Sequence, residues 1–288
     1  MTGIEWTDRT WNPVTGCTKV SPGCDHCYAE GIARRFAGTK AFPHGFDVTL
    51  HPERLDAPLR WRKPSRVFVN SMSDLFHDGV PDEFIARVFA VMAFTPRHTY
   101  QVLTKRHGRM RSLLTDPGFQ VAIEEYCTDL LLSAPCTRLT GDIRGWASRP
   151  AGVRAWAPAW PLPNVWLGCS VEDQKRAELR IPALLATPAA VRFLSVEPLL
   201  GSVTITGRWH ALDWVIIGGE SGPGARPMPL HWARSLLGDC RAHGIAPFVK
   251  QLGSVWAAGG GKGGDIDTWP PDLRIREFPP GPTSTDGK

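Results

Sequence analysis

Residues 191–197 read VRFLSVE, a short apolar run that ends abruptly in polar residues. The same pattern returns along the chain, with no internal sequence repeat. Continuous apolar runs without alternation are typical of parallel strands that are buried on both faces. We therefore predict a strand at each such run. These runs are residues 48–50, 67–69, 100–103, 165–168, 191–194, 214–217 and 247–249.

Helical patterns lie between several of these runs. Residues 82–95 place apolar side chains at a 3.6-residue period, and Pro81 suits the helix start. Residues 177–186 and 230–243 have the same periodicity, and Gly244 follows the second as a C-terminal cap. Strands that alternate with helices predict an α/β fold with a parallel sheet. A further strand just before Cys17 brings the count to about eight, which favours a TIM-type (β/α) barrel, full or partial, over an open doubly wound sheet.

The chain of 288 residues can form one such barrel with modest insertions. We predict a single α/β barrel domain over residues 1–256. It carries an N-terminal cysteine loop at 11–30 and an insertion at about 115–163, between the fourth and fifth strands. The insertion is too long for one crossover, and we expect a helix around 119–132. Residues 257–288 are predicted to form a Gly/Pro-rich cap and tail, disordered from about Pro279.

The amino-acid composition excludes few classes of binding partner. Lys and Arg number 33 against 28 Asp and Glu, so the net charge of +5 permits an anionic partner without requiring one. The first residues carry Glu5, Asp8 and Arg9, and no apolar run reaches the ~18 residues of a membrane span. We expect neither a secretory signal nor a membrane partner, and a cytoplasmic location.

Polar residues follow the predicted strands directly. In a parallel barrel the carboxyl ends of all strands meet on one face, where a site is built from several strands. Charges gathered there are paired with one another or serve a ligand. The strand-end residues that we expect at this face include Asn70, Ser73, Asp74, Lys105, Glu172, Ser195, Glu197 and Glu220.

Three of the seven cysteines crowd the N-terminus, at Cys17, Cys24 and Cys27. In a chain without an export signal, clustered thiols are more often metal ligands or redox groups than disulfides. Three thiolates fit either zinc or an iron–sulfur cluster. His26 is the nearest fourth zinc ligand, but it stands between two cysteines. Without a fourth ligand, one iron of a four-iron cluster keeps an open position for a cofactor.

Two stretches around these cysteines carry a resemblance. Residues 11–17, WNPVTGC, and 21–30, SPGCDHCYAE, resemble the opening of a phage- and bacteria-associated three-Cys-motif family of largely uncharacterised proteins. That family is itself similar to radical S-adenosylmethionine (SAM) proteins. Six residues separate Cys17 from Cys24, where radical SAM proteins usually have three, and His26 replaces the common aromatic residue. The resemblance continues over most of the chain outside 115–163, at residues 69–77, 103–106, 195–199, 218–222, 250–251 and 273–279.

The resemblance implies a radical SAM-type enzyme of unknown substrate on a radical-SAM-like barrel. A [4Fe–4S] cluster would bind the three cysteines, with SAM on its fourth iron. Reduction would cleave SAM to a 5′-deoxyadenosyl radical, which abstracts hydrogen from a substrate. The resemblance also implies an electron donor such as a flavodoxin or ferredoxin, and it leaves nucleic acid, a nucleotide or a partner protein as candidates.

Under this resemblance the candidate catalytic residues are Lys105, Glu197 and Glu220, and the candidate cofactor-binding residues are Asn70, Ser73, Asp74, Glu172 and Ser195. Three of them, at 70, 73 and 74, follow the cysteine loop in sequence and could hydrogen-bond the methionine or ribose part of SAM. Glu197 and Glu220 could face the ribose or the substrate. Lys105 and Arg106 could hold an anionic substrate group.

Two other hypotheses come from the residues alone. A nucleic-acid-binding protein with a structural zinc site would use the basic run at 105–111 and some of the 12 tryptophans. Salt-dependent binding of DNA or RNA by an iron-free protein would favour it. A cofactor-free barrel hydrolase would use Glu172, Glu197 and Glu220, but it leaves the three cysteines without a purpose.

Overall fold

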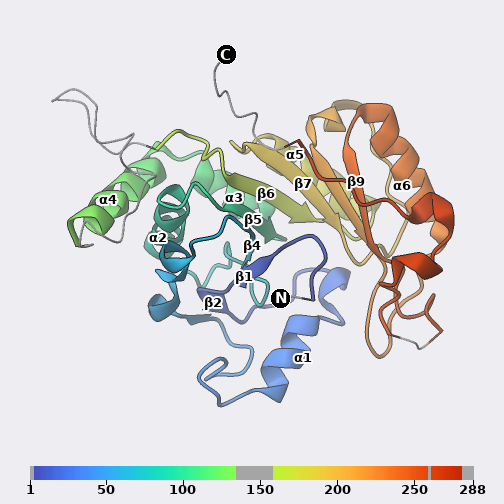
Figure 1. Cartoon of the computed structure of the whole chain (residues 1–288), viewed down its shortest axis with the longest axis horizontal. Helices are drawn as coiled ribbons and strands as arrows, with labels where there is room; N and C mark the ends of the chain where they lie inside the picture. Colours follow the sequence, from blue (N-terminus) through green and yellow to red (C-terminus); the bar gives the residue numbers. More distant parts are fainter. Residues whose placement is uncertain (1–2, 134–157, 259–260, 281–288) are drawn as a thin grey trace.

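The computed structural model describes residues 3–133, 158–258 and 261–280. Seven parallel strands form one curled sheet, a half-barrel with helices along one face (Figure 1). The prediction of a mixed α/β fold with a partial barrel is therefore confirmed. In sheet order the strands are β1 (Arg9–Trp11), β4 (Arg66–Val69), β5 (Thr99–Thr104), β6 (Val165–Ser170), β7 (Val191–Val196), β8 (Trp214–Gly218) and β9 (Ala246–Gln251).

One predicted barrel strand is wrong. Residues 48–50 supply β3 (Thr49–Leu50), which pairs antiparallel with β2 (Val14–Thr15) in a separate two-stranded sheet. The edge of β4 is already taken by β1, which pairs with it in parallel register. Within the described residues β1 and β9 do not pair, and the sheet stays open.

The helices follow the predicted periodicity closely. In α5, Asp173 accepts a hydrogen bond from the Arg176 amide at 2.9 Å, and this cap starts the helix three residues before the predicted start. Gly244 ends α6 at a φ of 68°, as a glycine cap does. The helices are α1 (Tyr28–Arg35), α2 (Asp82–Ala93), α3 (His107–Leu114), α4 (Pro117–Ser133), α5 (Gln174–Leu185) and α6 (Leu230–His243).

The predicted insertion begins with α4. This helix packs on α2 through the edge-to-face pair of Phe119 and Phe89, whose ring centroids lie 5.9 Å apart. Figure 1 shows α4 beside α2 at one side of the sheet. Residues 134–157 of the predicted insertion lie outside the described residues.

Side chains of one strand separate into two cores. In β4, Val67 and Val69 join the large core between the sheet and the helices, whereas Phe68 points to the opposite face. There it meets Trp6, at 4.6 Å between ring centroids. This second core is aromatic and contains Trp6, Phe68, Trp166, Phe193, Trp214 and Phe248. It supports the sheet on the face that has no helices.

The segment after β9 also packs on the sheet. Trp269 and Leu273 are fully buried, and Phe278 lies 5.3 Å from Trp214 between ring centroids. The Trp214 indole donates a hydrogen bond to the Glu277 carbonyl at 2.9 Å. Residues 281–288, which include most of the predicted disordered end, lie outside the described residues. None of the described helices combines the length and the apolar character needed to cross a bilayer.

Candidate functional site

The cysteine loop leaves β2 through a turn that only glycine can make. Gly16 has a φ of +83°, and a Cβ on it would lie 2.1 Å from the Asp47 carbonyl oxygen. The next amide, of Cys17, donates a hydrogen bond to the Phe46 carbonyl at 3.1 Å. The turn therefore fixes the first cysteine against residues 46–47, next to the carboxyl end of the sheet.

An arginine that follows β8 holds the rest of the loop. The Arg226 guanidinium donates to the Pro22 carbonyl at 2.9 Å and to Asp25 at 3.1 Å, on the loop that carries Cys24. The same guanidinium binds both oxygens of Glu220, at 2.9 and 2.5 Å. His26 Nδ1 lies 3.0 Å from the Glu220 carboxylate. We call these residues, Arg226, Glu220, His26, Pro22 and Asp25, the loop clamp.

The loop clamp keeps Glu220 ionised. Burial opposes ionisation of this carboxylate, but hydrogen bonds from Arg226 and His26 outweigh burial and lower its pKa from 4.5 to about 2. Glu220 was predicted as a catalytic residue. The structure places its carboxylate at the rim of a cavity, where its oxygens serve the clamp.

Glu172 supports the loop from beneath. A Cβ on Gly23 would lie 3.3 Å from the Glu172 carboxyl carbon, so the loop backbone rests on this side chain. Glu172 is 1% exposed and pairs with the buried Arg180 at 2.9 Å. It lines neither of the two cavities described below, although it was predicted to bind a cofactor. Arg180 also donates to the Ser170 carbonyl, so the pair ties the loop to β6.

All three loop cysteines line one cavity of about 140 Å³, which we call the cysteine cavity. Each is partly exposed. Burial, together with the nearby charge of Asp74, raises the pKa of Cys17 to about 12, although Arg106 opposes this effect. Cys27 is the N-cap residue of α1, and its side chain makes no capping hydrogen bond.

The donor set at this site is three thiols around one cavity. In the described parts of the chain, no three His, Cys, Asp or Glu side chains are arranged to hold a metal ion. A zinc ion needs its ligands around one point, whereas an iron–sulfur cluster spreads its thiolates over several irons. The three thiols are the groups here that could hold such a cluster.

Three predicted cofactor-binding residues form the opposite wall of the cysteine cavity. Asn70 has a φ of 58°, and its Oδ1 accepts from the Val14 amide at 3.3 Å. Its Nδ2 is buried and has no hydrogen-bond partner in the described structure. Ser73 donates to the Val14 carbonyl at 2.9 Å. Asp74 accepts from the Thr104 hydroxyl at 2.7 Å and from the Lys105 amide at 2.9 Å, so its carboxylate positions the end of β5.

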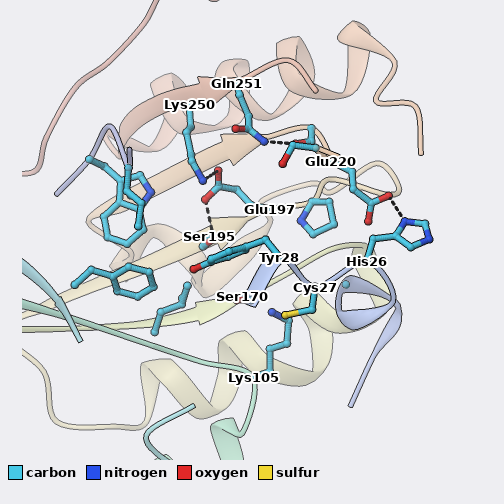
Figure 2. Close-up of a pocket in the computed structure, with 18 residues that line it drawn as sticks. His26, Cys27, Tyr28, Lys105, Ser170, Ser195, Glu197, Glu220, Lys250 and Gln251 are labelled. Carbon is cyan, nitrogen blue, oxygen red and sulfur yellow. Dashed lines mark hydrogen bonds and ion pairs between the residues drawn. The ribbon is translucent and has the colours of Figure 1, made fainter. Parts of the chain in front are cut away.

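A second cavity of about 190 Å³ adjoins the first, and we call it the charged cavity. Glu197 forms an ion pair with the Lys250 ammonium at 3.2 Å and accepts a hydrogen bond from the Ser195 hydroxyl at 3.1 Å (Figure 2). Gly218 allows this arrangement, because a Cβ there would lie 2.6 Å from Glu197 Oε1. Gln251 donates to the Gly219 carbonyl at 2.8 Å and closes the β9 side.

The two cavities share a wall. In Figure 2 the Tyr28 ring lies between Lys105 and Cys27 on one side and Glu197 and Lys250 on the other. The Tyr28 hydroxyl donates to the Ser71 carbonyl at 2.5 Å. No acceptor in the described part of the chain pairs with the Lys105 ammonium. The residues that line both cavities are Cys27, Tyr28, Phe68, Leu103, Lys105 and Ser170.

The structure thus brings most predicted site residues to one edge of the sheet. Sequence reasoning missed Arg226, which lies in a Gly- and Pro-rich loop without periodicity and has no signal beyond its charge. It also gave no role to Tyr28. In the predicted basic run, Arg106 donates to Thr18 and Arg109 donates to the carbonyls of His77 and Val80.

The comparisons with known proteins supply one match. The family model described as "Protein of unknown function (DUF5131)" matches residues 1–266. No curated protein and no solved structure gives a significant match. The matched range contains the whole half-barrel, the cysteine loop and both cavities. The chain therefore belongs to the DUF5131 family.

Proposed function

We propose that this protein is an iron–sulfur enzyme that holds a [4Fe–4S] cluster through Cys17, Cys24 and Cys27 and binds SAM beside it. The observation that carries the proposal is the shared wall. The cavity lined by the three thiols shares six lining residues with a second polar cavity at the same sheet edge. A cluster-bound cofactor that acts on a substrate would need the two cavities to lie side by side.

The cluster and SAM together supply one-electron reductive chemistry that leads to hydrogen abstraction from a substrate. The chain holds and orients the reacting parts. Asn70 lines the cysteine cavity, and its buried Nδ2 has no hydrogen-bond partner among the described residues. The unpaired Lys105 ammonium offers a cation at the shared wall. Both groups suit the carboxylate and hydroxyl oxygens of SAM.

The aromatic core under the cavities excludes water from below. Phe68 and Leu103 line both cavities, and Trp6 lines the charged cavity. Trp6 and Phe68 belong to the buried aromatic core. An apolar floor protects a reactive species from solvent and strengthens the electrostatic contacts around it. These side chains therefore support radical chemistry without entering it.

Anaerobic reconstitution with iron and sulfide tests the proposal. We expect the protein to bind four-iron clusters and, once reduced, to release 5′-deoxyadenosine from SAM. The Cys24→Ala variant removes one of three ligands, so cluster loading should be lost. Cys240→Ala is the matched control, because Cys240 is buried in α6 away from the loop and should leave loading unchanged. Zinc in place of iron, or full loading of Cys24→Ala, would overturn the proposal.

A further inference from the structure

The last two residues of β9 line the same cavity. Successive side chains of a regular strand point to opposite faces of the sheet. Phe248 and Val249 follow this rule, because the first joins the aromatic core and the second joins the core under the helices. Lys250 and Gln251 both line the charged cavity instead (Figure 2). The backbone of β9 must therefore depart from regular pleating between these two residues.

A bulge at Lys250 provides this departure. Ile217 of β8 pairs with Val249, and the next residue, Gly218, pairs with Gln251, so the register skips Lys250. An extra residue of this kind bends a strand and re-aims a side chain, and such bulges are frequent beside functional sites. Here the bulge allows two consecutive side chains to line one cavity.

Arg276 holds the bulge from outside the seven-stranded sheet. Its Nη2 donates to the Lys250 carbonyl at 3.1 Å, and its Nε donates to the Val249 carbonyl at 3.3 Å. The guanidinium carbon lies 5.5 Å from the Phe248 ring centroid and 5.3 Å from that of Trp269. Arginine suits this place, because its planar fork can stack on rings while its fixed donors reach two adjacent carbonyls.

The segment that carries Arg276 is itself paired with β9. The Val249 amide donates to the Ile275 carbonyl at 2.8 Å, and the Glu277 amide donates to the Pro247 carbonyl at 2.9 Å. These two hydrogen bonds flank Arg276 in sequence. They therefore fix the position of its side chain relative to the bulge.

We infer that Arg276 is a positioning residue for the charged cavity, because it stabilises the bulge that directs Lys250 to Glu197 and places Gln251 in the same cavity. Arg276 does not line this cavity, so it acts through the β9 backbone. The inference deepens the proposed function, in which the charged cavity is the substrate side of the site. It rests on that function only for the reaction, since the bulge and its support are independent of a cluster.

Competitive acetylation tests the position of Lys250. The full chain is treated with a trace of acetic anhydride, and mass spectrometry gives the acetylation rate of Lys250 relative to that of Lys105. Lys105 lines the same cavity, so a general opening of the cavity raises both rates and leaves their ratio unchanged. Arg276→Met keeps a long side chain over the two rings but removes the donors. We expect Lys250 to leave Glu197 and the ratio to rise several-fold.

Arg276→Lys is the conservative variant. It keeps a cation that can reach one carbonyl but not the fork that reaches two, so its ratio should lie between those of the wild type and Arg276→Met. This partial recovery also keeps the test valid if Arg276→Met does not fold. A wild-type ratio in both variants would overturn the inference.

Arg274→Met is the matched control. Arg274 lies in the same segment and donates to the carbonyls of Trp269 and Asp267, at 2.9 and 2.7 Å, which also belong to that segment. The variant therefore removes a comparable pair of hydrogen bonds without removing a bond to β9, and its ratio should match the wild type. An equal rise in Arg274→Met would assign the effect to general loosening of the segment and overturn the inference.

The inference and the proposed function fail separately. Iron loading of Arg276→Met should equal that of the wild type, because the hydrogen bonds of Arg276 in the described structure go to Val249, Lys250 and Gly264 and not to the cysteine loop. A wild type that binds no iron removes the proposed function and leaves the acetylation result standing. Normal iron loading with an unchanged acetylation ratio in Arg276→Met removes the inference alone.

Discussion

The cysteine cavity and the charged cavity share a wall but use their polar groups differently. In the cysteine cavity, Asn70 Nδ2 has no partner within the described structure. In the charged cavity, Glu197 pairs with Lys250, and Glu220 pairs with Arg226. Apart from Lys105, which lines both cavities, the first cavity therefore keeps one unpaired donor, whereas the two named carboxylates of the second are held in ion pairs. We therefore expect the cysteine cavity to contribute binding affinity for a ligand and the charged cavity to discriminate between ligands.

The two cavities also differ in what holds them in place. An irregular loop with a glycine turn builds the cysteine side, and buried ion pairs hold that loop from below and from the side. The ends of β7, β8 and β9 build the charged side, within the sheet itself. Variants that remove one support should therefore affect one cavity more than the other.

The largest effect is expected under the cysteine loop. Arg180→Met leaves the Glu172 carboxylate buried with only Arg176, at 3.7 Å, near it. Breaking a buried ion pair from one side costs about 3–5 kcal/mol of unfolding free energy. Urea unfolding should show this loss, and iron loading should fall as the loop loosens. The double variant Glu172→Gln/Arg180→Met should recover part of the stability, because no buried charge is then left alone. An unchanged midpoint in Arg180→Met would contradict this account.

An intermediate effect is expected on the charged side. Gly218→Ala places a methyl group 2.6 Å from Glu197 Oε1, so the carboxylate must move away from Lys250. We expect a loss of about 1–3 kcal/mol in unfolding free energy. Substrate or SAM affinity should weaken, while iron loading stays at the wild-type level. Gly238→Ala in α6 is the matched control, since its methyl group meets nothing within 4 Å. If Gly218→Ala lost iron loading as well as ligand affinity, the two cavities would not be structurally independent of each other.

The smallest effect is expected at the loop clamp, which joins the two sides. The pKa of Glu220 is depressed from 4.5 to about 2, so its ionised form stabilises the fold fully above pH 4.5. That contribution is lost as the pH falls through about 2. Acid unfolding of the wild type should therefore show a pH dependence in this window that Glu220→Gln lacks. Identical acid unfolding curves for the two proteins would rule out the clamp as a stabilising group.

The sequence was sufficient to locate most strands and helices, because their signals are local. Apolar runs such as 191–194 can be recognised as buried strands from their own composition. Residues 48–50 have the same composition, but they pair with β2 in a separate sheet, while β1 pairs with β4. The composition of a short strand does not show which distant segment it pairs with. Strand count, and with it barrel closure, could not be predicted for this reason.

The sequence predicted which residues gather at the candidate site, but not which of them pair with one another. The strand-end rule gathered Lys105, Glu197 and Glu220 at one edge, where the structure places them. It could not tell that Glu197 binds a lysine from β9 while Glu220 binds Arg226. Side-chain direction at a strand end depends on loop paths that have no periodicity. A carboxylate that faces a ligand and one that anchors a loop therefore look alike in sequence.

The common wall has a thermodynamic consequence. Tyr28 and Lys105 border both cavities, so a ligand that displaces either side chain changes the space and charge seen by a ligand on the other side. Equilibrium linkage then requires each occupant to alter the affinity of the other by the same factor. Tyr28 stands directly beside Cys27, so under the proposed function the state of a metal centre at the cysteines would be one of the two linked variables. Loading of the cysteine cavity and substrate selection in its neighbour would then be a single coupled equilibrium.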